Sequence, residues 1–598
     1  MNERKSHGFF GIAFLLPYIK PYRKKILIMV SLGIVSSLID SLYPLFNRYI
    51  LDHNIALKTL DTLPFLIIIY IALLSFQVWD NYYTTYICSR LELWMDRDLR
   101  NKSFCHLQTL SFTYFNKHSV GYIHARIMSD TGKIGELVSW RFMDIIWNLS
   151  YIVCIVIVML FVNVKLALVI IVLIPVSVII ILLFQKKLLP LNKAVREINS
   201  KISGHLNEGI TGIHTIKSLV AEDRMNCDFK AETLNMKRAS VKTAHHSALF
   251  TATMTFMSYA ALSLILWQGG QLTLDNIILI GTLSVFMSYA LDILEPIQNL
   301  IKSVSILISI QANIERLREL LNTESDVKDS KEVRERYGDA FLPRKENWEE
   351  LKGDIEFKDV SFIYPDGDEY VLKDFNLKVP FGTNVAIVGE TGAGKSTLVN
   401  LVCRFYEPTK GQLLIDGRDA RERSQGWLHA NLGYVLQTPH LFTGTVRENL
   451  IYGKPDASDE EIFTALKAVS ADELVKGLRD GLDTDVGEGG NVFSTGERQL
   501  ISFARAILCD PRILILDEAT SSVDSVTEER IQRAIKTLIK NRTSFVIAHR
   551  LSTITDADVI LAVRDGRIVE QGNHRELMAK RGYYFDLYTS QCVKYRDE

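Results

Sequence analysis

The sequence predicts two domains of different class, an all-α membrane domain with six helices followed by an α/β domain. A chain of 598 residues is too long to form a single hydrophobic core. Hydrophobic residues make up 48% of the chain and charged residues 23%, which indicates that the apolar residues are concentrated in one part. Strong hydropathy ends near Leu291. Beyond residue 353, short β-branched runs alternate with helical patterns, as is typical of an α/β fold.

Six apolar windows in the first half approach the roughly 20 residues that a helix needs to cross a bilayer. They cover residues 26–46, 63–79, 142–162, 166–183, 248–267 and 277–291. The preceding segment, FFGIAFLLPYIKPYRKK, has the apolar length of a secretion signal but lacks a small-residue cleavage site. It also runs directly into basic residues, so we expect an interfacial amphipathic helix there. These basic residues are Lys20, Arg23, Lys24 and Lys25.

Basic residues follow the second and fourth windows, whereas the short connection 268–276 has none. Because positive charge gathers on the cytosolic side, we expect a multi-pass protein of the cell membrane with both termini and the α/β domain in the cytosol. The long connections have helical patterns that break near Gly121 and at 209–212, so helices should project beyond the bilayer. The basic residues are Arg90, Arg97, Arg100, Lys102, Lys117, Arg126, Lys186, Lys187, Lys193 and Arg196.

We place the membrane domain at residues 1–321, a charged linker without regular structure at 322–353, and the α/β domain at 354–598. The linker composition, NTESDVKDSKEVRERYGDAFLPRKENWEELKG, separates the two hydropathy regimes. The formal net charge of −1 gives no indication of a nucleic-acid partner.

A phosphate-binding loop is predicted at residues 389–396, in the stretch VAIVGETGAGKSTLVNLV. An apolar strand precedes it and a helix follows, as G-x-x-x-x-G-K-[ST] requires. Small residues let backbone N–H groups surround phosphates, Lys395 supplies charge to the β and γ phosphates, and Ser396 supplies a Mg²⁺ ligand. A glycine turn that binds nothing is the alternative. The predicted ATP-binding residues here are Gly389, Glu390, Thr391, Gly392, Ala393, Gly394, Lys395, Ser396 and Thr397.

Two carboxylates, Asp517 and Glu518, end a second apolar strand in RILILDEATSSVD. Asp517 can hold the Mg²⁺ shell, while Glu518 can polarise a water for attack on the γ-phosphate. The alternative is an acidic pair that merely opens a turn.

These motifs resemble the ABC exporter family, and the whole chain resembles one half-transporter, a membrane domain fused to an ABC ATPase. The resemblance covers nearly all of the chain. Its elements recur in the family's order: SFIYP, the phosphate loop, GYVLQTPHLFTGTVRENL, TDVGEGG, a signature region, LDEATSSVD and IAHRLST.

The resemblance implies roles for three further residues. Tyr364 would stack on adenine, with a core tyrosine as the alternative. Gln437 would sense Mg²⁺ or the attacking water and link the site to the membrane domain. His549 would donate a hydrogen bond to the γ-phosphate, with a structural histidine as the alternative.

The signature loop, usually similar to LSGGQ, crosses a dimer interface in this family and completes the partner's ATP site. Ser494 and Gly496 remain for γ-phosphate contact, whereas Thr495 and Glu497 should weaken it through bulk and negative charge. This chain's own ATP site has intact motifs, whereas the loop that it supplies to the partner's site is altered. The two ATP sites of the dimer should therefore be unequal, as in heterodimeric bacterial multidrug ABC exporters, which this chain resembles. Tolerance of signature changes in a homodimer is the alternative. The five positions are Phe493, Ser494, Thr495, Gly496 and Glu497.

Several acidic residues lie in or beside the apolar windows and should avoid lipid. Asp292 and Glu295 are three apart, on one helical face near Phe286 and Tyr289. They could line a site for cationic amphipathic compounds or form hydrogen bonds between helices, and both interpretations stay open. The other acidic residues are Asp40, Asp80 and Asp144.

The resemblance therefore implies ATP-driven efflux of small amphipathic or cationic compounds by alternating access, with ATP and Mg²⁺ as cofactors. The implied partners are a second half-transporter, the lipid bilayer and a small-molecule substrate. Segments 121–126 and 209–217 should contact the ATPase domains, the second mainly that of the partner. A lipid or peptide exporter, and an ATP-gated channel or regulator, are the alternatives.

Overall fold

The computed structural model describes residues 12–517, 525–547 and 554–596. The chain forms two compact units. The first is made from the described parts of Met1–Leu107 and Val120–Thr323, and the second from Gln108–Ser119 and the described parts of Glu324–Glu598.

The first unit contains six helical stretches that are long and apolar enough to cross a membrane, counted over the described residues. Five of the six predicted windows fall within one of them, and the sixth, 277–291, begins three residues before the stretch that contains the rest of it, so the all-α membrane domain is confirmed. The stretches are 43 to 53 residues long. At about 1.5 Å per residue, each is at least twice as long as a hydrocarbon core about 30 Å thick. They are Ala13–Ile55, Leu63–Leu107, Val120–Val162, Val164–Thr211, Glu222–Leu274 and Ile280–Asn322.

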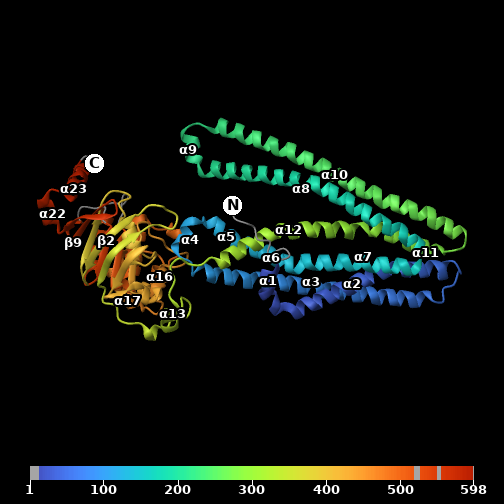
Figure 1. Cartoon of the computed structure of the whole chain (residues 1–598), viewed down its shortest axis with the longest axis horizontal. Coiled ribbons are helices and arrows are strands. Elements are labelled where there is room, and N and C mark those ends of the chain that lie inside the picture. Colours follow the sequence, from blue (N-terminus) through green and yellow to red (C-terminus); the bar gives the residue numbers. More distant parts are fainter. Residues whose placement is uncertain (1–11, 518–524, 548–553, 597–598) are drawn as a thin grey trace. The chain divides into compact units, whose positions relative to one another are not determined.

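Three of these stretches are single α-helices, and short 3₁₀ or π segments join helices within the stretches Ala13–Ile55 and Val120–Val162. Helices α8 and α10 run side by side and are joined through the short α9 (Figure 1). The breaks expected near Gly121 and 209–212 are present, since α5 starts at Val120 and Gly212 ends α8. The helices of this unit are α1 (Ile12–Ile19), α2 (Arg23–Tyr49), α3 (Leu63–Leu107), α5 (Val120–His124), α6 (Thr131–Glu136), α7 (Phe142–Val162), α8 (Val164–Thr211), α9 (Ile213–Ser218), α10 (Glu222–Leu274), α11 (Ile280–Asp292) and α12 (Leu294–Asn322).

Small residues on α2 allow close packing against α7. A Cβ on Gly33 would lie 2.5 Å from the Cε of Met143, so a larger side chain there would force the helices apart. A second apolar core joins α7, α8, α10 and α11 around Ile155, Ile170 and Phe286. Tyr289 on α11 donates a hydrogen bond of 2.5 Å to the Ser41 carbonyl on α2, which ties these helices together.

The second unit is an α/β domain with two sheets, which confirms the second part of the predicted fold. A four-stranded antiparallel sheet has the order β2-β1-β4-β5, and a six-stranded sheet has the order β10-β9-β3-β8-β7-β6. In the larger sheet only β10 is antiparallel to its neighbour. The strands are β1 (Ile355–Phe362), β2 (Leu372–Val379), β3 (Asn384–Val388), β4 (Lys410–Ile415), β5 (Arg418–Asp419), β6 (Leu432–Val435), β7 (Ile513–Asp517), β8 (Thr543–Ile547), β9 (Val559–Arg564) and β10 (Arg567–Gly572).

The central strands of the larger sheet are apolar on both faces. In β7, Ile513 and Ile515 join the core shared with the smaller sheet, while Leu514 and Leu516 join a core formed with the helices. Because parallel strands lie in one direction, the carboxyl ends of β3, β6, β7 and β8 meet at one edge. The helices are α4 (Phe112–Lys117), α13 (Lys331–Tyr337), α14 (Lys395–Val402), α15 (Gln425–Ala430), α16 (Val446–Leu450), α17 (Asp459–Ala468), α18 (Asp472–Lys476), α19 (Thr495–Leu508), α20 (Ser525–Ile539), α22 (His574–Lys580) and α23 (Tyr583–Arg596).

The expectation that 322–353 has no regular structure is wrong. Helix α13 lies within it, and Val333 and Tyr337 are buried. Asp329 accepts a hydrogen bond of 2.9 Å from the buried Arg404, and Trp427 donates its indole N–H to the Glu349 carbonyl at 2.7 Å. The high charge that suggested a solvated linker instead supplies the groups that fasten this segment to the α/β domain.

Helix α4 belongs to the α/β unit, although it comes from a connection between membrane helices. The Phe112 ring packs on Phe405 with centroids 4.4 Å apart, and Asn116 Nδ2 donates to Tyr406 Oη at 2.9 Å. The segment Phe112–Lys117 therefore packs within this unit, just ahead of the 121–126 segment for which we expect a contact with an ATPase domain. Aromatic side chains on α4 make this packing.

Candidate nucleotide-binding site

The predicted phosphate loop connects β3 to α14 in a conformation that needs glycine. Gly392 and Gly394 have φ values of +86° and +101°, in the left-handed region. A Cβ on Gly389 would lie 2.2 Å from the Val563 carbonyl oxygen, whereas a Cβ on Gly392 would meet no atom within 4 Å. The loop is thus tightly held at its first glycine and open to a ligand at Gly392, and the N-terminus of α14 follows directly.

Lys395 is folded back over this loop. Its Nζ donates to the carbonyl oxygens of Gly389 and Glu390, each at 2.8 Å. Burial lowers the pKa of Lys395, and the nearby Asp517 carboxylate offsets part of that shift. A half-buried ammonium whose acceptors among the described residues are two neutral carbonyls is well suited to an anionic ligand.

Oxygen ligands that suit Mg²⁺ lie at the same edge of the sheet. Asp517 ends β7, and Ser396 is exposed in the first turn of α14. In the described part of the chain no group of three His, Cys, Asp or Glu side chains could hold a metal ion alone. The Ser396 hydroxyl and the Asp517 carboxylate are oxygen ligands of the kind that suits a Mg²⁺ ion sharing its coordination with phosphate oxygens. Glu518 and His549 lie outside the described residues.

Tyr364 lies beside the phosphate loop. Its ring packs edge-on against Phe362 and Tyr406, with centroids 4.8 and 5.1 Å away. Its hydroxyl shares a hydrogen bond of 2.9 Å with Thr397 Oγ1 in α14. The ring is partly exposed, so one face can still accept an adenine base while the hydroxyl holds it against α14.

Gln437 follows β6, and its side chain is exposed. Since β6 pairs in parallel with β7, Gln437 lies beyond the carboxyl end of the strand next to the one that ends in Asp517. The structure therefore places Gln437, Asp517 and the phosphate loop at one edge of the sheet.

The signature residues form the start of α19. Phe493 is buried in the helical core, and Gly496 is also buried, while Ser494 and Thr495 are exposed. Ser494 is the N-cap of α19, and Glu497 completes a capping box with it. We did not predict this box, although the spacing S-x-x-E before an apolar helix signals it.

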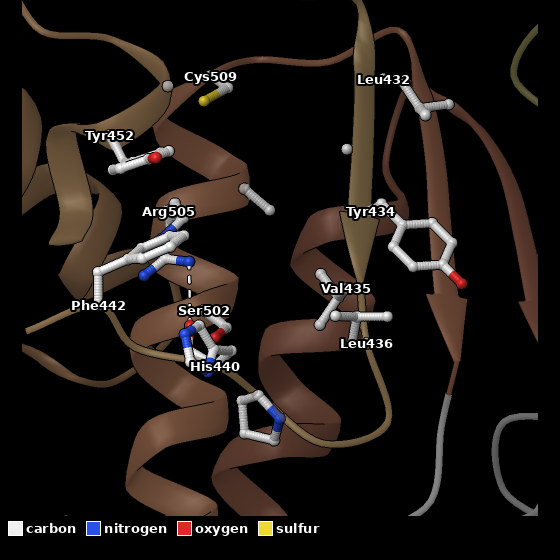
Figure 2. A pocket seen from close by; sticks show the side chains of 14 residues that line it. Leu432, Tyr434, Val435, Leu436, His440, Phe442, Tyr452, Ser502, Arg505 and Cys509 are labelled. Carbon is white, nitrogen blue, oxygen red and sulfur yellow. Dashed lines mark hydrogen bonds between the residues drawn. The ribbon is translucent and has the colours of Figure 1, made fainter. Parts of the chain in front are cut away.

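A pocket of about 370 Å³ lies between β6 and α19 (Figure 2). Phe442 and Tyr452 stack at its rim, with ring centroids 4.5 Å apart and an interplanar angle of 10°. Arg505 lies 5.8 Å from the Phe442 centroid and donates from Nη1 to the His440 carbonyl at 3.2 Å. Burial lowers the pKa of Arg505. We did not predict this pocket; its signal was two exposed aromatic residues within HLFTGTVRENLIYG.

Comparison with known proteins gives one consistent result. Residues 26–296 match the family described as the ABC transporter transmembrane region, and residues 372–521 match the family described as ABC transporter. The ABC transporter ATP-binding protein YknV of Bacillus subtilis is 35% identical over 96% of this chain and 94% of its own length.

Two relatives are named as multidrug export ATP-binding/permease proteins. YgaD of Bacillus subtilis is 34% identical over 96% of this chain and 98% of its own length. A protein of Staphylococcus aureus strain NCTC 8325 is 34% identical over 96% of this chain and 99% of its own length.

Proposed function

Because this chain belongs to the ABC transporter family, we propose that it exports small amphipathic or cationic compounds by alternating access, as one half of an asymmetric heterodimer. The chain is a multi-pass, ATP-hydrolysing half-transporter. The observation that carries the proposal is that the described residues contain six helical stretches of membrane length, fused to an ATP-binding domain whose phosphate loop has its glycine conformations. The names of the multidrug export relatives support the substrate class.

We propose that each part of the chain has its own role in transport. Residues 1–321 would form the transport pathway, 322–353 would connect it to the ATPase domain, and 354–598 would bind ATP. The positions of the basic residues support a cytosolic ATPase domain and cytosolic termini in the cell membrane.

We propose that Lys395 leaves the Gly389 and Glu390 carbonyls and pairs with the β and γ phosphates of ATP. Backbone N–H groups of residues 389–397 would bind the same phosphates, and Tyr364 would stack on the base. Ser396, Asp517 and Gln437 would hold Mg²⁺, which neutralises phosphate charge when bound. Glu518 would activate the attacking water, and His549 would donate to the γ-phosphate.

Ser494 and Gly496 would contact ATP bound to the partner's phosphate loop. The exposed position of Ser494 at the start of α19 supports this role, because a helix N-terminus favours anions. Thr495 and the negative charge of Glu497 would weaken the contact. This chain's own phosphate loop would then form the faster site and the partner's loop the slower one, and a homodimer is the alternative.

ATP-driven closure would reach the membrane helices through two contacts. Helix α4 already packs on the ATPase unit of its own chain. The turn around α9 carries the exposed apolar residues Ile213, Leu219 and Val220, and we propose that it docks on the partner's ATPase domain. The corresponding turn of the partner would enter the pocket beside Phe442 and Tyr452, whose aromatic rim suits apolar side chains.

The test is transport in inside-out vesicles that contain this chain and its partner half-transporter. We expect ATP to drive a cationic amphipathic dye into the vesicles against its gradient, and Glu518→Gln to stop this uptake. If the dye moves only down its gradient, and ATP binding without hydrolysis is enough to allow this movement, the result would instead support a channel. Uphill movement of lipid or peptide but not of dye would remove the proposed substrate class.

A further inference from the structure

One face of α3 is buried, and the large side chains on that face are apolar except for one aspartic acid. Buried residues recur every three or four positions along this helix, as expected for one packed face. Asp80 is the first of them and is 0% exposed. The stripe consists of Asp80, Thr84, Cys88, Leu91, Met95, Leu99, Ser103 and Leu107.

Neither carboxyl oxygen of Asp80 accepts a hydrogen bond from any described residue. The Ser36 hydroxyl on α2 approaches the carboxyl without reaching hydrogen-bond geometry. One turn further along α3, the Thr84 hydroxyl is also buried and without a hydrogen-bond partner in the described chain. An ionised carboxylate without donors is highly unfavourable in such a place, whereas a neutral carboxylic acid is tolerated.

Asp40, on α2, has the opposite surroundings. It accepts a hydrogen bond from Gln77 Nε2 on α3. The Gln77 carbonyl in turn accepts from the Tyr43 hydroxyl, which fixes the orientation of the amide. The Gln77 amide donor favours a negative charge on Asp40, while no described residue donates a hydrogen bond to the carboxyl of Asp80.

The helical spacing brings the two acids to one interface. Ser36 and Asp40 are four residues apart on α2, and Gln77 and Asp80 are three apart on α3, so each pair lies on one face. Asp40 contacts Gln77, and Ser36 approaches Asp80. Because the carboxyl groups interact electrostatically, ionisation of one disfavours ionisation of the other.

The groups named around this pair are acidic or neutral except Arg141, whose guanidinium is bound to other carboxylates. Tyr43 on α2 and Tyr70 on α3 are two of these groups. The others are Tyr151 on α7 and Asp292 on α11, which lie within electrostatic range of Asp40 or its neighbours. On α7, Asp144 forms an ion pair with Arg141, which also binds Glu136. Among the described residues no Lys or Arg forms an ion pair with Asp40 or Asp80, so no side-chain cation can neutralise them.

We propose that Asp80 is a proton-binding site inside the membrane domain, with ionised Asp40 as its paired carboxylate. The Asp80 O–H bond holds the proton while α2 and α3 stay packed. Water admitted between these helices would hydrate the carboxylate form, so the O–H bond would break and the proton would leave to that water. The transport cycle would then take up and release one proton at Asp80.

Infrared difference spectroscopy on the complete transporter in nanodiscs tests this proposal. We expect a protonated-carboxyl C=O band at neutral pH, where aspartic acid in water is ionised. Asp80→Asn should remove the band, because the amide replaces the neutral acid. Asp40→Asn should leave a band from Asp80, shifted by the loss of the neighbouring charge. Asp275→Asn, at the exposed end of α10, is the matched control and should leave the band unchanged.

Three outcomes would overturn the proposal. A band that survives Asp80→Asn would place the proton elsewhere. A band that appears in choline chloride but disappears when sodium chloride replaces it would identify a metal-cation site at this pair. Should Asp80→Asn fail to assemble, loss of the band in Asp40→Asn would contradict the assignment by itself.

Discussion

Glu497 and Ser494 hold each other in place at the start of α19. Glu497 Oε2 accepts a hydrogen bond of 2.8 Å from the Ser494 backbone N–H, and Ser494 Oγ accepts one of 3.3 Å from the Glu497 N–H. The residue that alters the signature is therefore also part of the helix cap. Its charge can weaken phosphate contact in the partner's site while its geometry preserves the loop.

Glu497→Gln should raise ATP turnover at the partner's site. Glutamine can keep the capping box, and it removes a negative charge from the proposed phosphate contact. The measurement is steady-state ATPase activity of the complex with this chain's own site silenced by Glu518→Gln. Ser494→Ala is the structural control, expected to cost about 0.5–2 kcal/mol of stability without raising turnover. Unchanged turnover in Glu497→Gln would argue against a charge effect.

Lys395 should change how the stability of the ligand-free protein depends on pH in the alkaline range. Burial lowers its pKa below the ordinary 10.5, so the folded protein binds fewer protons than the unfolded chain just below that pH. Burial of the Lys395 ammonium lowers the free energy of unfolding by its full amount below the pKa of the folded protein. This loss of stability disappears as the pH rises toward 10.5. Thermal unfolding midpoints should therefore fall less steeply with pH in the wild type than in Lys395→Met. Identical pH profiles would contradict this assignment.

Phe112→Ala should uncouple transport from ATP hydrolysis. The Phe112–Phe405 pair holds α4 on the ATPase unit, and an aromatic pair contributes about 0.5–1.5 kcal/mol beyond area burial. We expect basal ATPase activity to remain and its stimulation by transported dye to fall. Phe115→Ala, an exposed position on the same helix, is the control. Equal loss of stimulation in both variants would assign the effect to helix propensity.

Arg404→Gln should destabilise the ATPase unit strongly. Arg404 is 2% exposed and joins Asp329, Glu407 and the Arg423 carbonyl. Removing one partner from such a buried network costs about 3–5 kcal/mol. Thermal unfolding measures the effect. Arg418→Gln, which breaks the exposed pair with Glu349, should change stability by about 1 kcal/mol or less. Similar shifts for both variants would contradict a structural role for Arg404.

Much of the architecture could be predicted because it depends on local, periodic signals. The six spans follow from hydropathy, and the phosphate loop follows from glycine spacing between a strand and a helix. Parallel strands then bring Asp517 and Gln437 to the same edge without further information.

The missed features depend on contacts between residues far apart in the sequence. The partner of Phe112 is Phe405, and the partner of Asp329 is Arg404. Composition alone made α13 resemble a solvated linker, because its fastening charges are indistinguishable from exposed ones until their partners are known. The capping box at Ser494 is an exception, because the local spacing S-x-x-E is enough to predict it.

A structure of the Glu518→Gln variant with its partner half-transporter, ATP and Mg²⁺ tests the central claim most directly. We expect the triphosphate at Lys395 to be covered by the signature loop of the other chain, and the residues 493–497 to face the nucleotide on the partner's phosphate loop. A nucleotide enclosed by this chain alone, with no second polypeptide against it, would contradict the account.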